Sequence, residues 1–165
     1  MIVPDTLMLG PNGWVPNNPA LPVLIYRGAV PTGDPDRSEA TLRRHGWRPD
    51  WRNGVCPYHH YHSTAHDALA CSSGSAELML GGEGGQAVTI AAGDLLVLPA
   101  GTGHCRISAT GDFLLVGAYP EGQEWDVCRQ SADEATLQRI AAVPLPRADP
   151  IAGERGPLVT LWAAP

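Results

Sequence analysis

Short hydrophobic runs, separated by glycine and proline, recur along most of the chain. They lie at residues 21–27, 56–62, 67–72, 76–80, 86–91, 95–98, 104–109 and 112–119. Each run has the length of a strand, and the runs are rich in Val, Ile, Leu and Thr with turn residues between them. This pattern is typical of an antiparallel sandwich or barrel, and we expect the strands to close into a jelly roll, which protects their edges.

Two segments have helical rather than strand periodicity. One lies around 37–45, with Asp36 as its predicted N-cap and Gly46 as its stop, and the other lies around 132–142 and ends before Pro144. In the second segment apolar residues recur on one face, and both helices are predicted to pack against the sheets as covers.

The length of 165 residues predicts a single domain, residues 1–165. Its core is expected at about 54–120, with N-terminal strands from 1–53 and a C-terminal helix and tail from 121–165 packing on it. Proline lacks the amide donor of a sheet ladder, so the proline-rich part of the tail, 144–157, is predicted to wrap the outside.

Composition excludes several classes of function. The chain has 11 basic and 17 acidic residues, a net charge of -6 and no extended basic run, so nucleic acid is not an expected partner. It contains no lysine, which excludes Schiff-base chemistry. No apolar stretch reaches the roughly 20 residues of a membrane helix. The 4 cysteines have no Cys-x-x-Cys spacing and no signal-peptide pattern is present, so a cytoplasmic protein is expected.

Two histidine-containing segments predict a metal site. His60 and His62 are two residues apart in a run predicted to be extended, which places both imidazoles on one face. His104 follows a turn containing Pro99 and Gly101, which is expected to direct it toward the same concave face. Neutral imidazoles are common ligands of divalent metals.

The spacing of these segments resembles the two motifs of the RmlC-like cupin superfamily. The first fits G-x5-H-x-H-x3,4-E-x6-G with Asp67 in place of Glu, and the second fits G-x5-P-x-G-x2-H-x3-N with Ser108 in place of the closing Asn. The matching residues are Gly54, His60, His62, Gly74, Gly93, Pro99, Gly101 and His104. The resemblance implies an all-β fold, a double-stranded β-helix (jelly-roll or cupin barrel) with short flanking helices.

Outside the motifs, the chain resembles the small bacterial cupins of the YjlB-like family almost end to end. The segments that carry this likeness are 13–18, 21–26, 60–66, 119–126, 149–150 and 156–162. The resemblance implies a homodimer, because cupins commonly pair in this way.

The fourth ligand has two candidates. Asp67 has the spacing of the motif's carboxylate, although its side chain is one methylene shorter than that of Glu and reaches roughly 1.5 Å less far. His66 is the alternative, because the motif tolerates three or four residues before the acid. A carboxylate beside imidazoles matches the usual ligand set of one divalent transition metal, Fe, Mn, Ni or Zn, which favours Asp67.

Three further residues are candidates for lining the pocket. Tyr58 shares the face of the histidine pair and is placed to hydrogen-bond a bound molecule. Cys71 is four residues after Asp67 and so faces the same side of the strand. This position fits either a pocket residue or a small buried hydrophobe. Arg106 is two residues after His104 and so faces the same side of the strand. It is suited equally to binding a substrate carboxylate and to a surface position.

The sequence predicts a metal-binding cupin and leaves two functions open. Cupins at large include dioxygenases, decarboxylases and isomerases, so one hypothesis is a metal-dependent enzyme acting on a small oxygen-containing molecule. The other is a non-catalytic module that binds or senses a metal or small molecule, which the absence of a general base apart from the ligands favours. A purely structural dimeric scaffold would leave the histidine cluster unexplained.

Overall fold

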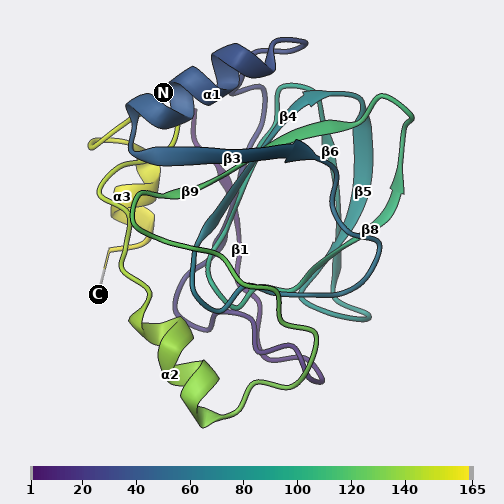
Figure 1. The fold of residues 1–165 in the computed structure, drawn as a ribbon, viewed down its shortest axis with the longest axis vertical. Helices are drawn as coiled ribbons and strands as arrows, with labels where there is room; N and C mark the ends of the chain where they lie inside the picture. Colours follow the sequence, from purple (N-terminus) through teal and green to yellow (C-terminus); the bar gives the residue numbers. More distant parts are fainter. Residues whose placement is uncertain (1, 164–165) are drawn as a thin grey trace.

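Two antiparallel sheets face each other and enclose the interior of the protein (Figure 1). The computed structural model describes residues 2–163. The larger sheet has six strands in the order β1-β2-β7-β4-β9-β3, and the smaller has three in the order β6-β5-β8. The expected all-β jelly-roll class is confirmed. The strands are β1 Asp5–Leu7, β2 Val23–Tyr26, β3 Trp47–Asn53, β4 Asp67–Ser73, β5 Ser75–Leu80, β6 Gln86–Ala91, β7 Leu95–Leu98, β8 His104–Ala109 and β9 Leu114–Pro120.

Two strands were missed and one predicted strand is wrong. The run 56–62 forms only isolated bridges, in which His60 pairs with His104 and Tyr61 pairs with Cys128. Because its two partners belong to different segments, no continuous ladder forms there. The missed strands are β1, which is short, and β3, whose arginines and Pro49 hide its strand character.

The larger sheet is buried on both of its faces. Along β4, Leu69 and Cys71 point into the core between the sheets, whereas Ala68 and Ala70 point into a second core on the outer side. This second core is covered by α1 (Pro35–Arg44) and α3 (Pro157–Leu161), as Figure 1 shows. The three-stranded sheet buries one face only, so in β5 buried Leu78 alternates with exposed Glu77.

The helices begin at caps other than those predicted. Asp34 rather than Asp36 caps α1, because its carboxylate accepts a hydrogen bond from the Arg37 N–H at 3.1 Å and Pro35 suits the first turn. Asp133 caps α2 (Glu134–Ala142), which begins two residues later than the predicted segment 132–142. The helix α3 was not predicted, since it begins within the proline-rich tail.

A buried carboxylate fixes the C-terminal tail to the outer side of the larger sheet. Asp149 is fully buried and accepts hydrogen bonds from the Tyr26 hydroxyl at 2.6 Å and the Leu158 N–H at 2.9 Å. The burial and the bond to Asp149 raise the pKa of Tyr26, so the phenol stays a donor. The tail therefore packs outside the sheet, as the prolines predicted.

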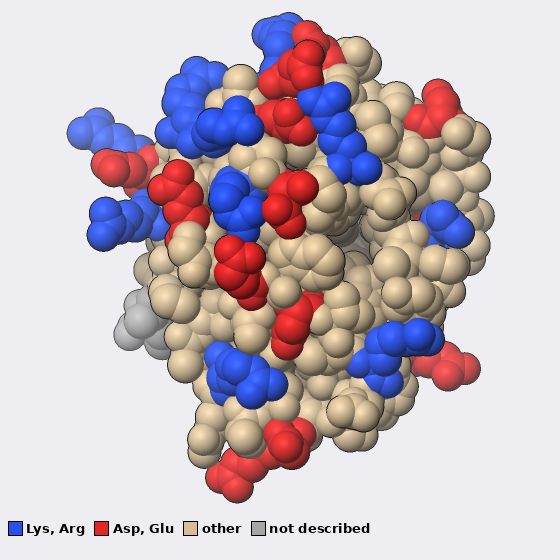
Figure 2. All heavy atoms as spheres, viewed as in Figure 1, with Lys and Arg blue, Asp and Glu red and all other residues tan. Residues whose placement is uncertain are grey.

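On the face shown in Figure 2, acidic and basic side chains are interspersed, and neither sign covers the face alone. Within residues 2–163, no helix is both long enough and apolar enough to cross a membrane.

Candidate metal centre

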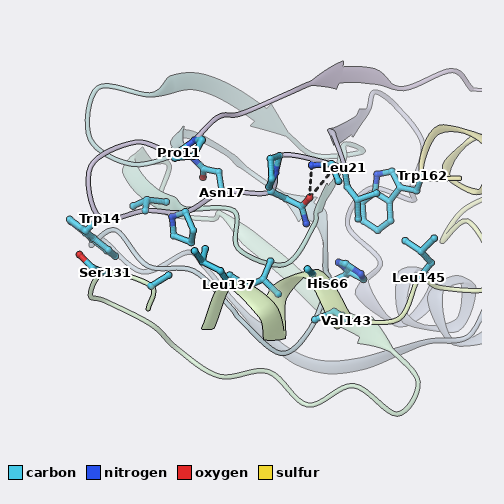
Figure 3. A pocket seen from close by; sticks show the side chains of 18 of the residues that line it. Pro11, Trp14, Asn17, Leu21, His66, Ser131, Leu137, Val143, Leu145 and Trp162 are labelled. Atoms are coloured by element: carbon cyan, nitrogen blue, oxygen red, sulfur yellow. Dashed lines mark hydrogen bonds between the residues drawn. The ribbon is translucent and has the colours of Figure 1, made fainter. Parts of the chain in front are cut away.

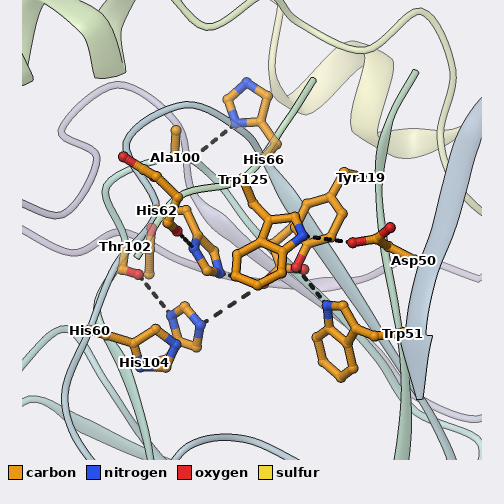
Figure 4. Close-up of polar contacts among 12 residues, drawn as sticks. Asp50, Trp51, His60, His62, His66, Ala100, Thr102, His104, Tyr119 and Trp125 are labelled. Atoms are coloured by element: carbon orange, nitrogen blue, oxygen red, sulfur yellow. Dashed lines mark hydrogen bonds and ion pairs between the residues drawn. The ribbon is translucent and has the colours of Figure 1, made fainter. Parts of the chain in front are cut away.

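Three buried histidines meet at one end of the space between the sheets (Figure 4). His60 and His62 come from the bridged segment before β4, and His104 is the first residue of β8. The ring centroids of His60 and His104 are 4.1 Å apart, and that of His62 lies 5.6 Å from His60 and 5.2 Å from His104. One ligand nitrogen from each ring lies within 4.8 Å of the others, so the three could hold one metal ion.

Backbone carbonyls fix the orientation of all three rings. In each ring the Nδ1 atom contacts a carbonyl oxygen, which can only accept, so Nδ1 carries the proton and Nε2 keeps a free lone pair. The partners are Tyr58 for His60 at 3.0 Å, Asp126 for His62, and Thr102 for His104 at 3.0 Å. The rings are thus in the tautomer that a metal requires.

The charge state of the rings follows from burial. Burial lowers the pKa of His60, and it lowers the pKa of His104 well below the ordinary histidine value. Burial also acts to lower the pKa of His62, but the nearby carboxylate of Asp67 outweighs it, and the pKa is raised. His62 is therefore the ring most closely linked to a carboxylate.

Asp67 lies next to the histidines and has no hydrogen-bonding partner of its own. As the first residue of β4 it points inward, with Oδ2 3.5 Å from His62 Nε2 and 3.9 Å from His104 Nε2. Both carboxylate oxygens are buried, and neither has a hydrogen-bond partner among residues 2–163. An unpaired buried carboxylate costs several kcal/mol, and a metal ion beside the three rings would remove that cost.

His66 lies away from the three clustered histidines, in a separate cavity that we call the His66 cavity. Its Nδ1 accepts a hydrogen bond from the Ala100 N–H at 2.9 Å, and its ring centroid is 4.9 Å from that of Trp162. Burial lowers its pKa to about 4. The His66 cavity has a volume of about 720 Å³ and is lined mainly by apolar side chains from residues 11–21 and α2 (Figure 3). Of the two candidates, the structure thus brings only Asp67 to the histidine cluster.

A cavity of about 390 Å³ opens beside the cluster, and we call it the histidine cavity. It is lined by His60, His62, Asp67, His104, Asp50, Trp51, Asn53, Gly54, Val55, Cys56, Leu69, Tyr119, Trp125 and Val127. Trp125 lies in the wall of this cavity. Trp51 was missed because β3 was missed. Tyr119 was missed although it lies in a predicted strand. The alternation of inward and outward residues along β9 was the signal that could have placed it in the cavity.

Tyr58, Cys71 and Arg106 are not among the residues that line the histidine cavity. Tyr58 is half-buried, with the Arg129 guanidinium 3.8 Å above its ring. Cys71 has the face of Asp67 but lies four residues along β4, in the core, where burial raises the pKa of its thiol to about 11. Arg106 extends toward Gly54, at the other end of the segment that carries the histidine pair.

Comparison with known proteins identifies a relative that is similar over almost the whole chain. No family model matches the chain. The protein YjlB of Bacillus subtilis (strain 168) is 38% identical over 160 residues, which covers 96% of each chain. A solved structure of HEPD from Streptomyces albus, with 2-hydroxyethylphosphonate and Fe(II) bound, is 14% identical with a TM-score of 0.29. That match covers 86% of this chain and 27% of the HEPD chain, so this chain spans about a quarter of its length.

The identity to YjlB extends over nearly the whole of both chains, and the fold is the jelly roll that the motifs imply. Kinship of this kind establishes ancestry and leaves the reaction to be argued from the site. The chain belongs to the YjlB-like family of cupins.

Proposed function

We propose that this protein is a metal-dependent enzyme that acts on a small oxygen-containing molecule. His60, His62, His104 and Asp67 are the proposed ligands of one divalent transition metal, Fe, Mn, Ni or Zn. The observation that carries the proposal is the convergence of three free Nε2 atoms beside an open cavity. Nitrogen and carboxylate donors together suit these metals.

The chain's own residues supply the positioning that such a site needs. A bound divalent metal would contribute Lewis-acid or redox chemistry. The Asp126 carbonyl holds the His62 ring, and the Asp126 carboxylate accepts hydrogen bonds from the Ser63 hydroxyl and from the Ser63 N–H, the latter at 2.6 Å. These contacts keep the ring from rotating, which is the usual role of groups behind a metal ligand.

The alternative is a non-catalytic module that binds or senses a metal or small molecule. It is supported by the scarcity of free general bases, because Asp50 at the cavity edge already bonds Arg48 at 2.9 Å and the Trp125 indole N–H at 2.7 Å. Catalysis requires coordination positions that exogenous ligands can reach, whereas a sensor with a closed site does not.

Azide binding to the cobalt(II)-loaded protein separates the two functions. Cobalt(II) absorbs visible light according to its ligands, and we expect azide to change the spectrum of the loaded wild-type protein in a saturable way. The variant His104→Ala serves as the control that lacks a complete site. Full cobalt occupancy with no response to azide would contradict the enzyme proposal and favour the sensing module.

A further inference from the structure

Three aromatic side chains form one wall of the histidine cavity (Figure 4). The rings of Tyr119 and Trp125 are nearly parallel, with an interplanar angle of 19° and centroids 6.0 Å apart. Both rings meet His62 close to edge-on, at centroid distances of 6.1 Å and 5.7 Å. The third member, Trp51, donates its indole N–H to the Tyr119 hydroxyl at 2.8 Å. A molecule bound at the histidines therefore lies against flat apolar surfaces.

The position of Trp51 depends on a glycine in the neighbouring strand. Trp51 lies opposite Gly117 in the β3–β9 ladder. A Cβ atom at residue 117 would lie 2.1 Å from Cε2 of Trp51, so only glycine lets the indole lie flat against β9. Trp51 and Tyr119 are thus built into the sheet, whereas Trp125 comes from the loop after β9.

The charges of the histidine cavity are unsuited to a multiply charged anion. Its charged lining residues are the acids Asp50 and Asp67, and none of its lining residues is an arginine. Arg48, which contacts the lining residue Asp50, is already paired with it at 2.9 Å and with Glu124 at 3.6 Å. Because Arg48 already balances Asp50, a bound divalent metal beside Asp67 would leave only one net positive charge. A dianion such as phosphate would then be desolvated without a cationic partner from the protein.

One hydrogen-bond donor in the wall is unused. The Tyr119 oxygen accepts the Trp51 N–H, and among residues 2–163 the structure gives the hydroxyl proton no acceptor. Burial and the charge of Asp67 raise the pKa of Tyr119, so the phenol keeps its proton. It is placed to donate to an oxygen of a bound molecule.

We propose that the histidine cavity takes a small uncharged molecule with a flat ring, whose oxygen atoms bind the metal and accept from Tyr119 while its ring packs on Trp51 and Trp125. This inference deepens the proposed function and rests on it, because the metal is the anchor for the oxygens. An uncharged molecule with a planar apolar body fits the wall and the charges of the cavity, whereas a multiply charged anion does not.

A matched pair of probes tests the inference. Acetohydroxamic acid and benzohydroxamic acid are uncharged in neutral solution, lose the same proton to solvent on chelation and offer a metal the same two oxygens, but only the second has a ring. Titrated into the cobalt(II)-loaded protein and followed by visible absorption, benzohydroxamic acid should bind at least about 10-fold more tightly than acetohydroxamic acid, the size expected of a ring packed on aromatic side chains. Inorganic phosphate should bind more weakly than both.

Substitutions in the two cavities test which side chains produce the preference for the ring. Trp125→Leu should reduce the preference for the ring to about threefold or less, whereas Trp14→Leu, an aromatic change in the His66 cavity, should leave it intact. Tyr119→Phe should weaken both hydroxamic acids by about the same factor, roughly fivefold, because the hydroxyl contacts the shared oxygens.

Cobalt content is measured for each protein, so that failure of the metal site is recognised separately. Loaded protein that responds to azide and acetohydroxamic acid but shows no preference for the ring would overturn this inference and leave the proposed function standing. Tighter binding of phosphate, or a ring preference unchanged in Trp125→Leu, would also overturn it. Unchanged affinities in Tyr119→Phe would refute the role given to the hydroxyl.

Discussion

The two cavities of this protein differ less in their volumes than in what their polar atoms do. In the His66 cavity, the side-chain amides of Asn17 and Asn18 each donate to a backbone carbonyl and accept from a backbone N–H, and His66 accepts a backbone N–H. In the histidine cavity, three ring nitrogens and the carboxylate of Asp67 converge on one another without a donor between them. The smaller cavity is therefore the proposed functional site, because converging polar atoms, rather than volume, indicate a binding centre.

The largest expected effect is the loss of metal affinity when a ring is removed from the cluster. His60→Ala or His104→Ala should weaken metal binding by about 1,000-fold, which corresponds to about 4 kcal/mol, whereas His66→Ala should leave it within about threefold. Competition with a chromophoric chelator measures the affinity, and circular dichroism checks that the variants are folded. Equal affinity in all three variants would erase the distinction between the two cavities.

The His66 cavity should instead reveal itself in the pH dependence of stability. His66 has a folded-state pKa of about 4, below its ordinary value of 6.5, so the unfolded chain binds more protons between these values. Its neutral ring contributes stability above pH 6.5 that is lost as the pH falls toward 4, by about 3 kcal/mol. Urea unfolding of metal-free protein should show a flatter pH profile for His66→Gln than for wild type, and parallel profiles would contradict this role.

Asp67 and His66 can be distinguished by their effects on metal binding. Asp67→Asn keeps the shape of the side chain and removes its charge, so it should weaken metal binding by roughly 30-fold, about 2 kcal/mol. A larger loss of affinity in His66→Ala than in Asp67→Ala would make His66 the ligand after all. If neither change weakens binding, the centre consists of three histidines alone.

The smallest effect concerns the aromatic wall. Gly117→Ala should displace Trp51 and destabilise the protein by about 1 to 2 kcal/mol, because the new methyl group overlaps the indole. Metal affinity should stay unchanged, since Trp51 lies outside the ligand set, while the preference for benzohydroxamic acid should fall. Thermal unfolding and the same titrations measure both, and an unaltered preference would remove Trp51 from the wall.

The sequence predicted the fold and the centre of the site better than the surroundings of the site. Motif spacing fixes His60, His62 and His104 because each follows a turn or bridge that the motif glycines and proline permit. The alternation of residues along a strand predicts which face a side chain is on, but not how far along the strand the site extends. Cys71 therefore shares the face of Asp67 and yet lies in the core. Trp51 could not be foreseen, since its place depends on the pairing of β3 with β9.

The homodimer and the cytoplasmic location stay predictions. Sedimentation velocity of the purified protein measures the first. A monomer would show that the pairing common among cupins is not general in this family.

An anomalous difference map from crystals grown with the bound metal tests the central claim most directly. We expect one strong peak, about 2.1 Å from Nε2 of His60, His62 and His104 and from one oxygen of Asp67. A fully occupied metal located elsewhere in the protein, or the absence of a peak among these four side chains in crystals soaked with excess metal, would contradict the account.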